Sequence, residues 1–275
     1  MEMSKLWIYL LLSFVLFTFS CEEPYPYKID DTTKYVIVEG LLTNEYGYQR
    51  VKLSYSFADP GDTIEYINNA TVIVRTKGRQ YAFHHPDSLP GIYISNVKFA
   101  ATIDRVYTLF AMVDNKIYKA ATEVYPVDLP DTLRYEYVPQ EGLYRISYVG
   151  PVFDPFEASM YIIDLDWSNL PDYDTMPYDS THARMYFFTL RTMDVNELFQ
   201  PYQQQVFFPK GTRIVEKKYS LTPFFESYIR AMLIETQWSG SLFDTQHWNL
   251  PTNIEGGALG FFTASSVVKR EYVVE

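Results

Sequence analysis

Short apolar segments at regular intervals are the feature that most restricts the fold of this chain. Beginning at Tyr35, segments that are apolar or alternate between apolar and polar residues are separated by residues typical of turns. They read YVIVEG, RVKLSYSF, TVIVRT, GIYIS, VYTLFAMV and KIYKAATEV. A period of two places successive side chains on opposite faces of a strand, and short strands separated by turns are typical of a β-sandwich. The pattern therefore predicts an immunoglobulin-like β-sandwich domain over residues 34–125.

A second, β-rich domain is predicted over residues 126–275. Pro126 and Pro130, with polar residues between them, indicate a stiff junction. The strand-like segments that follow read LRYEYV, YRISYV, SMYIIDL, ARMYFFTL and TRIVEKKYSL. The whole chain is thus expected to be mainly β, and its second domain is expected to be of α+β type because it also contains helix.

The clear helical signal of the second domain lies near residues 222–237. Thr222 is a good helix cap, a proline follows it, and apolar residues then recur three or four positions apart. A shorter helix over residues 194–199 is indicated by Asp194 and Glu197, which have the spacing of a capping box.

The N-terminus has the order of a bacterial signal peptide. A lysine is followed by the uncharged run 6–19, a serine and Cys21, which is the only cysteine of the chain. We expect residues 1–20 to be removed, Cys21 to carry the lipid (palmitate among its acyl chains), and residues 21–33 to form a tether. A transmembrane anchor is the competing interpretation, but a span needs about 20 apolar residues and this run ends before Glu22.

Charge narrows the class of partner. The formal net charge of the chain is -11, and it is the same after residues 1–20 are removed, because that segment carries one acid, Glu2, and one base, Lys5. Such an acidic protein repels nucleic acid, so no nucleic-acid partner is expected.

Aromatic residues suggest where a ligand could bind. The chain has 25 Tyr and 19 Phe, and aromatic rings stack on the apolar faces of sugars. The alternative interpretation is that these are ordinary strand residues with buried rings and hydrated hydroxyls. The polar stretch from Asp166 to His182 is expected to be an exposed loop, and within it Trp167, Tyr173 and Tyr178 are candidate ligand residues.

No motif in the sequence predicts a catalytic, metal or cofactor site. His84 and His85 are neighbours on a predicted strand and point to opposite faces, so one metal ion does not take both. Five aspartates could supply calcium ligands or the carboxylate pair of a glycosidase, but neither spacing is met, and an exposed acidic loop explains them as well. They are Asp164, Asp166, Asp172, Asp174 and Asp179. The expected protein is not an enzyme and needs no cofactor.

Several tripeptides of the form Asp-(Ser/Thr)-X resemble an acceptor sequence for periplasmic O-glycosylation in Bacteroidota. Ordinary turn and cap chemistry of the same residues is the alternative. The candidate acceptors are Thr32, Thr63, Ser88, Thr132, Thr175 and Ser180.

The ordered sequence features resemble a lipoprotein family of Bacteroidota that is catalogued as domain of unknown function 4249. The segments that carry the resemblance are Cys21, Tyr35–Gly40 with Leu42-Thr43, Val51–Ser54, Asn69–Val74, Pro90–Tyr93, Tyr107–Leu109, Thr252–Ile254 and Ala258–Phe262. They extend over nearly the whole chain after Cys21. In the middle third the chain matches the family only in its general pattern of residues. Asp104-Arg105 stands where the family would have a glycine.

The resemblance implies an outer-membrane lipoprotein with an N-terminal sandwich of the transthyretin type, often encoded near TonB-dependent receptors. Glu22 and Glu23 look like the acidic signal that sends such lipoproteins to the cell surface. We therefore expect a non-enzymatic accessory or ligand-binding partner of a TonB-dependent transporter. A carbohydrate-binding or adhesion protein is the second hypothesis, and a glycosidase is the third.

Overall fold

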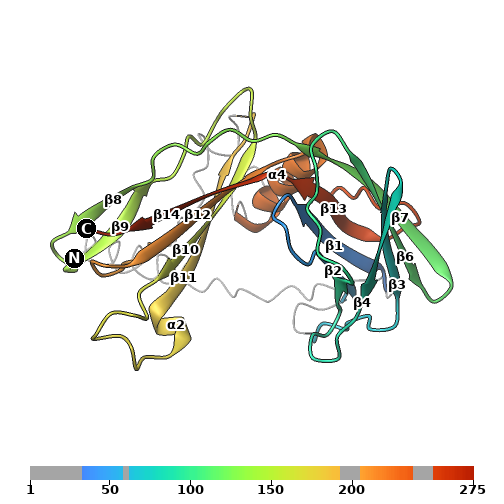
Figure 1. Cartoon of the computed structure of the whole chain (residues 1–275), viewed down its shortest axis with the longest axis horizontal. Helices are drawn as coiled ribbons and strands as arrows, with labels where there is room; N and C mark the ends of the chain where they lie inside the picture. Colours follow the sequence, from blue (N-terminus) through green and yellow to red (C-terminus); the bar gives the residue numbers. More distant parts are fainter. Residues whose placement is uncertain (1–32, 58–61, 193–204, 238–249) are drawn as a thin grey trace, which may run out of the picture.

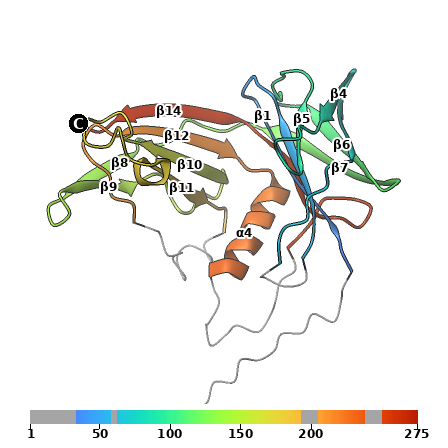
Figure 2. The ribbon, with the colours of Figure 1, turned by 90° about the horizontal axis from the view of Figure 1, so that it is seen from below.

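The protein consists of a β-barrel and a separate antiparallel sheet, which lie side by side with a helix between them (Figures 1 and 2). The computed structural model describes residues 33–57, 62–192, 205–237 and 250–275. Strands dominate these residues, so the prediction of a mainly β chain is confirmed.

Eight strands close the barrel in the order β1-β13-β7-β6-β3-β4-β5-β2. Their bounds are β1 Val36–Thr43, β2 Arg50–Tyr55, β3 Thr71–Thr76, β4 Arg79–His84, β5 Ile92–Ser95, β6 Val106–Val113, β7 Lys116–Tyr125 and β13 Leu259–Ser265. Alternate residues of β1 are buried, as the period of two predicts. The barrel interior is filled by side chains such as those of Val38, Leu53, Leu109 and Phe262, each with 0% exposure.

The immunoglobulin-like sandwich expected for residues 34–125 is replaced by this barrel. The cause is β13, which lies parallel to both neighbours and joins β1 to β7, with Val38 opposite Gly260 and Val124 opposite Ala264. Alternation of buried and exposed residues is the same in a sandwich and a barrel, so it could not reveal this closure. The barrel also uses chain from both sides of the boundary that was expected near residue 125.

The second body is a four-stranded antiparallel sheet, here called the C-terminal sheet, in the order β11-β10-β12-β14. Its strands are β10 Ser159–Asp166, β11 His182–Thr189, β12 Arg213–Ser220 and β14 Val267–Val273. A hairpin of β8 Arg134–Val138 and β9 Leu143–Tyr148 covers one face of the sheet, here called the outer face; the opposite face is called the inner face. The hairpin contributes Tyr135, Tyr144 and Ile146 to the core on the outer face.

Among the described residues, two helices lie beside the C-terminal sheet. The short α2, Tyr178–Thr181, precedes β11, and α4, Pro223–Gln237, packs Phe225, Ile229 and Leu233 onto the inner face. The helix predicted near residues 222–237 is therefore confirmed. Its cap is Thr222, whose hydroxyl accepts a hydrogen bond from the backbone N–H of Phe225 at 3.1 Å. Seen from below, α4 fills the space between the sheet and the barrel (Figure 2).

The two bodies are joined at a short, hydrogen-bonded junction. Only Ser266 separates β13 in the barrel from β14 in the C-terminal sheet. The Ser220 hydroxyl at the end of β12 donates to the Tyr125 carbonyl at 2.8 Å and accepts from the Ser266 N–H at 2.9 Å. One hydroxyl therefore links the ends of β7 and β12 to the residue between β13 and β14.

Several predictions concern residues outside the described part of the chain. These are the signal peptide over residues 1–20, lipidation of Cys21, the tether up to residue 32 and the short helix over residues 194–199. Within the described part, no helix is long and apolar enough to cross a membrane.

Replacing Gly260 by alanine is expected to destabilise the protein by roughly 2–4 kcal/mol. Gly260 has a φ of 95°, and an added Cβ would lie 2.1 Å from the Val38 carbonyl oxygen in the neighbouring strand. Urea denaturation would measure the loss. The control is Gly47→Ala, where an added Cβ meets nothing within 4 Å. Equal stability of the two variants would contradict the tight β1–β13 contact.

Candidate functional site

The open half of the inner face of the C-terminal sheet is the candidate functional site. At one end of this face, Met160, Phe188 and Tyr219 pack into the core beneath α4. Beyond the helix the same face carries mostly charged side chains, because the strand register brings every second residue of each strand to it. In strand order the positions are Tyr186, Arg184 and His182; Ile162, Asp164 and Asp166; Lys217, Val215 and Arg213; and Lys269, Glu271 and Val273.

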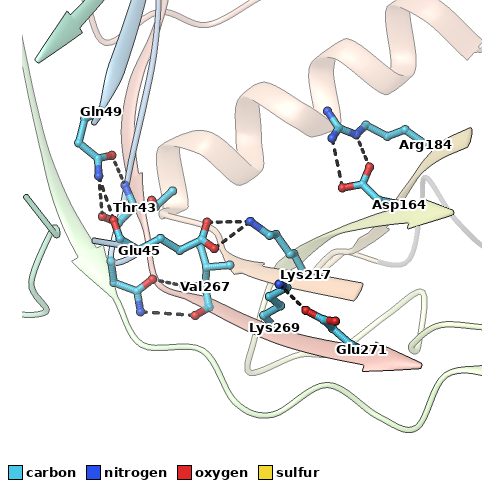
Figure 3. A network of polar contacts seen from close by, with 10 residues as sticks. Thr43, Glu45, Gln49, Asp164, Arg184, Lys217, Val267, Lys269 and Glu271 are labelled. Carbon is cyan, nitrogen blue, oxygen red and sulfur yellow. Dashed lines mark hydrogen bonds and ion pairs between the residues drawn. The ribbon is translucent and has the colours of Figure 1, made fainter. Parts of the chain in front are cut away.

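Ion pairs between neighbouring strands, and one within β14, fix these charged groups (Figure 3). Arg184 forms a two-pronged contact with Asp164, with Nε–Oδ1 at 2.5 Å and Nη2–Oδ2 at 3.1 Å. Glu271 accepts from Arg213 at 2.7 Å and pairs with Lys269 at 2.5 Å. Hydrogen bonds from Lys269 and Arg213 lower the pKa of Glu271 to about 2. The groups are therefore held in defined positions although they are partly exposed.

The barrel also contributes to this face through its β1–β2 turn. Glu45 in that turn accepts two hydrogen bonds from the Lys217 ammonium, at 2.8 and 3.0 Å (Figure 3). The side-chain oxygen of Asn44 accepts from the Val267 N–H at 2.7 Å, and Gln49 braces the turn by accepting from the Thr43 N–H at 3.0 Å. The face is thus bordered by both bodies.

Aromatic rings line the β11 edge of the face. The rings of Tyr178 and His182 are stacked, with centroids 3.9 Å apart and an interplanar angle of 14°. His182 is also held by Asp166, at 3.2 Å, and Asp166 accepts from the Ser168 hydroxyl at 2.7 Å. Tyr178 is 70% exposed and Tyr186 is 53% exposed. Large rings on open surface are available for contact with a ligand.

The three aromatic residues expected to form one ligand loop lie in different environments. Trp167 is 7% exposed and belongs to the core on the outer face of the sheet, and Tyr173 packs against that core. Tyr178 alone among the three has a largely exposed ring. The apolar parts of Trp167 and Tyr173 are therefore used for packing, and a ligand contact at Tyr178 stays a prediction.

Several of the candidate metal and catalytic residues take part in other contacts in the structure. His84 bonds Asn96 through Nδ1 at 2.8 Å, whereas His85 lies against the Tyr93 ring. Asp164 and Asp166 form the pairs already described. In the described part of the chain, no group of three or more His, Cys, Asp or Glu residues is arranged to hold a metal ion.

The candidate O-glycosylation acceptors that the structure describes are all exposed. They are Thr63, Ser88, Thr132, Thr175 and Ser180, and Thr32 lies outside the described residues. Exposure is what a modified hydroxyl requires, and it is equally what turn residues show, so modification stays a prediction.

Sequence reasoning named Asp164 and Asp166 but missed the basic and aromatic residues beside them on the open inner face. Arg184 and Tyr186 alternate within HARMYFFT, and Lys217 and Lys269 occupy corresponding positions in two other strands. Alternate polar residues in a strand do indicate one solvated face. The register that aligns them over three strands, however, is a tertiary property.

A buried carboxyl lies on the opposite, outer face of the sheet. Glu216 in β12 has 0% exposure, and its Oε2 accepts from the Tyr272 hydroxyl at 2.8 Å. Burial raises the pKa of Glu216, which the Tyr272 hydrogen bond and nearby Arg270 counteract only in part. Asp131 raises this pKa and Lys218 lowers it. Glu216 therefore keeps its proton to a higher pH than an exposed glutamic acid.

Fold and surface together define a class: a mainly β protein in which a barrel and an antiparallel sheet share a polar, partly aromatic face. The chain belongs to the family described as Domain of unknown function (DUF4249), whose model matches residues 22–271. The match confirms the predicted resemblance to domain of unknown function 4249, and the lipoprotein character stays a prediction. No curated protein matches the chain.

Replacing Glu216 by glutamine is expected to stabilise the protein at neutral pH. The native state holds the Glu216 proton at pH values where the unfolded chain has lost it, so the wild-type free energy of unfolding falls as pH rises from the unfolded pKa of 4.5 through the raised native pKa. The advantage of Glu216→Gln should therefore grow with pH. Urea denaturation between about pH 4 and 7 measures it.

Glu271→Gln is the control of opposite sign. Because the native pKa of Glu271 is lowered to about 2, its stabilisation is present at neutral pH and is lost as the pH falls below the unfolded value of 4.5. A Glu216→Gln curve that runs parallel to wild type over the whole range would contradict a raised native pKa.

Proposed function

We propose that the protein is an outer-membrane lipoprotein, exposed at the cell surface, that serves as a non-enzymatic ligand-binding accessory of a TonB-dependent transporter. The observation that supports binding is the open inner face, where strands of one body and a turn of the other present fixed charges beside exposed rings. Preorganised groups bind a ligand with less loss of side-chain entropy than mobile ones.

Membrane attachment is supported by the order of residues at the N-terminus. The apolar run 6–19 leads directly to the single cysteine, Cys21. The family match begins at residue 22, immediately after this cysteine. Residues 1–20 thus stand outside the family domain, as a removed signal peptide would, and lipid on Cys21 would hold the domain at the membrane.

The protonation states at the inner face favour binding over glycoside hydrolysis. A hydrolytic general acid needs a raised pKa so that it carries a proton near neutral pH. Burial raises the pKa of Asp166, but hydrogen bonds from Ser168 and the nearby His182 outweigh this and lower it below its usual value. Asp166 is therefore a carboxylate suited to accept hydrogen bonds. Asp164 is paired with the Arg184 guanidinium.

The choice of transporter follows from the family resemblance, which implies genes near those of TonB-dependent receptors. A lipid-anchored protein at the cell surface lies beside such receptors in the same membrane. Its acidic surface, with a net charge of -11, would keep it from nonspecific adhesion to other acidic surfaces.

Purification of the tagged protein from native membranes is expected to recover a TonB-dependent receptor in comparable amount. The Cys21→Ala variant should appear in the soluble fraction and should recover much less receptor, because it is no longer confined to the membrane. Mass spectrometry identifies the recovered proteins, and membrane fractionation locates each variant.

Two outcomes of this purification experiment would contradict the proposed function. If Cys21→Ala has lost residues 1–20, as its mass shows, and still stays in the membrane fraction, lipid attachment at Cys21 is wrong. If wild type is membrane-bound and recovers no receptor, the accessory role is wrong and the protein acts without a transporter.

A further inference from the structure

The exposed rings of the inner face form a line along one strand. His182, Arg184 and Tyr186 occupy alternate positions of β11, so His182 and Tyr186 are about 13 Å apart along the strand. Tyr178 extends the line through its stack on His182. We call these four residues the β11 rim. Because its rings are separated by a charged residue, the rim differs from a continuous apolar patch.

Polar groups of the rim are held in place by neighbours. Arg184 hydrogen-bonds the Tyr186 side chain as well as Asp164, and Asp166 holds His182. The rings of His182 and Tyr186 therefore each have a polar partner beside them. A ligand that lies along the rim meets alternating aromatic surface and hydrogen-bonding groups.

The charge of the open inner face is balanced, although the whole chain carries -11. Its cations are Arg184, Arg213, Lys217 and Lys269, and its anions are Glu45, Asp164, Asp166 and Glu271. Seven of these groups pair among themselves, and Asp166 pairs with His182. The face thus offers no net field to attract a strongly charged ligand, which favours a neutral one.

A neutral ligand that matches this surface must carry many hydroxyl groups. Hydroxyls donate to carboxylates and accept from guanidinium and ammonium groups, so they can replace water around an ion pair without breaking it. The C–H groups on a sugar ring carry partial positive charge and pack on the negative face of an aromatic ring. A protein partner is a poorer match, since the centres of protein interfaces are depleted in Lys, Glu and Asp.

We propose that the β11 rim binds a neutral oligosaccharide, whose sugar rings stack on Tyr178 and Tyr186 while its hydroxyls bond Arg184, Asp164 and Asp166. This inference rests on the proposed ligand-binding role and names its ligand class. The distance between the rings requires more than one sugar unit, because no single ring spans both.

The test uses the lipidated protein purified in detergent and a panel of neutral hexasaccharides: maltohexaose, cellohexaose, laminarihexaose, xylohexaose and mannohexaose. Binding is screened on an array, and the best ligand is titrated by calorimetry. We expect at least one of them to bind, and Tyr178→Ala and Tyr186→Ala each to weaken that binding by roughly tenfold. Tyr186→Phe keeps the ring and should keep most of the affinity.

Tyr137→Ala is the matched control. Tyr137 lies in the β8–β9 hairpin and is 52% exposed, against 53% for Tyr186, so both substitutions remove a half-exposed tyrosine from a strand. Affinity should be unchanged in this variant. Circular dichroism of all variants checks that the fold is retained.

Three results would overturn the inference. One is the absence of binding to every member of the panel at about 1 mM. Another is binding that survives both Tyr178→Ala and Tyr186→Ala. The third combines two findings: the protein binds no oligosaccharide, and Tyr186→Ala no longer recovers the receptor in the membrane purification. That combination would make the rim a contact surface for a protein. In the first two cases an unaltered receptor recovery leaves the proposed accessory role standing.

Discussion

The parallel pairing of β13 with β1 and β7 is the interaction on which both bodies depend. It closes the barrel and thereby removes the free edges that β1 and β7 would otherwise present. The same chain continues through Ser266 into β14, the edge strand of the C-terminal sheet. Since Gly260 allows the approach of β13 to Val38, one residue without a Cβ is required for the closure.

The position of the inner face follows from that continuity. With β13 in the barrel and β14 in the sheet, the β1–β2 turn is brought beside β12, where Glu45 meets Lys217. Helix α4 enters between the bodies and covers the apolar part of the sheet. The charged part is left open because its residues could be buried only at a large desolvation cost. The division of one sheet face into a packed half and an open half is thus a direct result of side-chain chemistry.

The pKa values of Glu216 and Glu271, on opposite faces of the same sheet, are shifted in opposite directions. On the outer face, Glu216 has 0% exposure, so burial outweighs the nearby Arg270 and Lys218 and raises its pKa. On the inner face, Glu271 is close to two cations in partly exposed surroundings, so the cations dominate and its pKa is low. Alternation along β12 and β14 is enough to produce this contrast, because neighbouring residues face opposite environments.

The sequence by itself determined the mainly β character, the strand segments and the helix near residues 222–237, since alternation, turn residues and helix caps act within a few residues. It also supplied the N-terminal order ending in Cys21 and the family resemblance. Barrel closure, the burial of Trp167 and the alignment of Arg184, Asp164 and Lys217 were decided only by the tertiary structure. These depend on register and on contacts between residues far apart in the chain, such as Glu45 with Lys217, which no local pattern encodes.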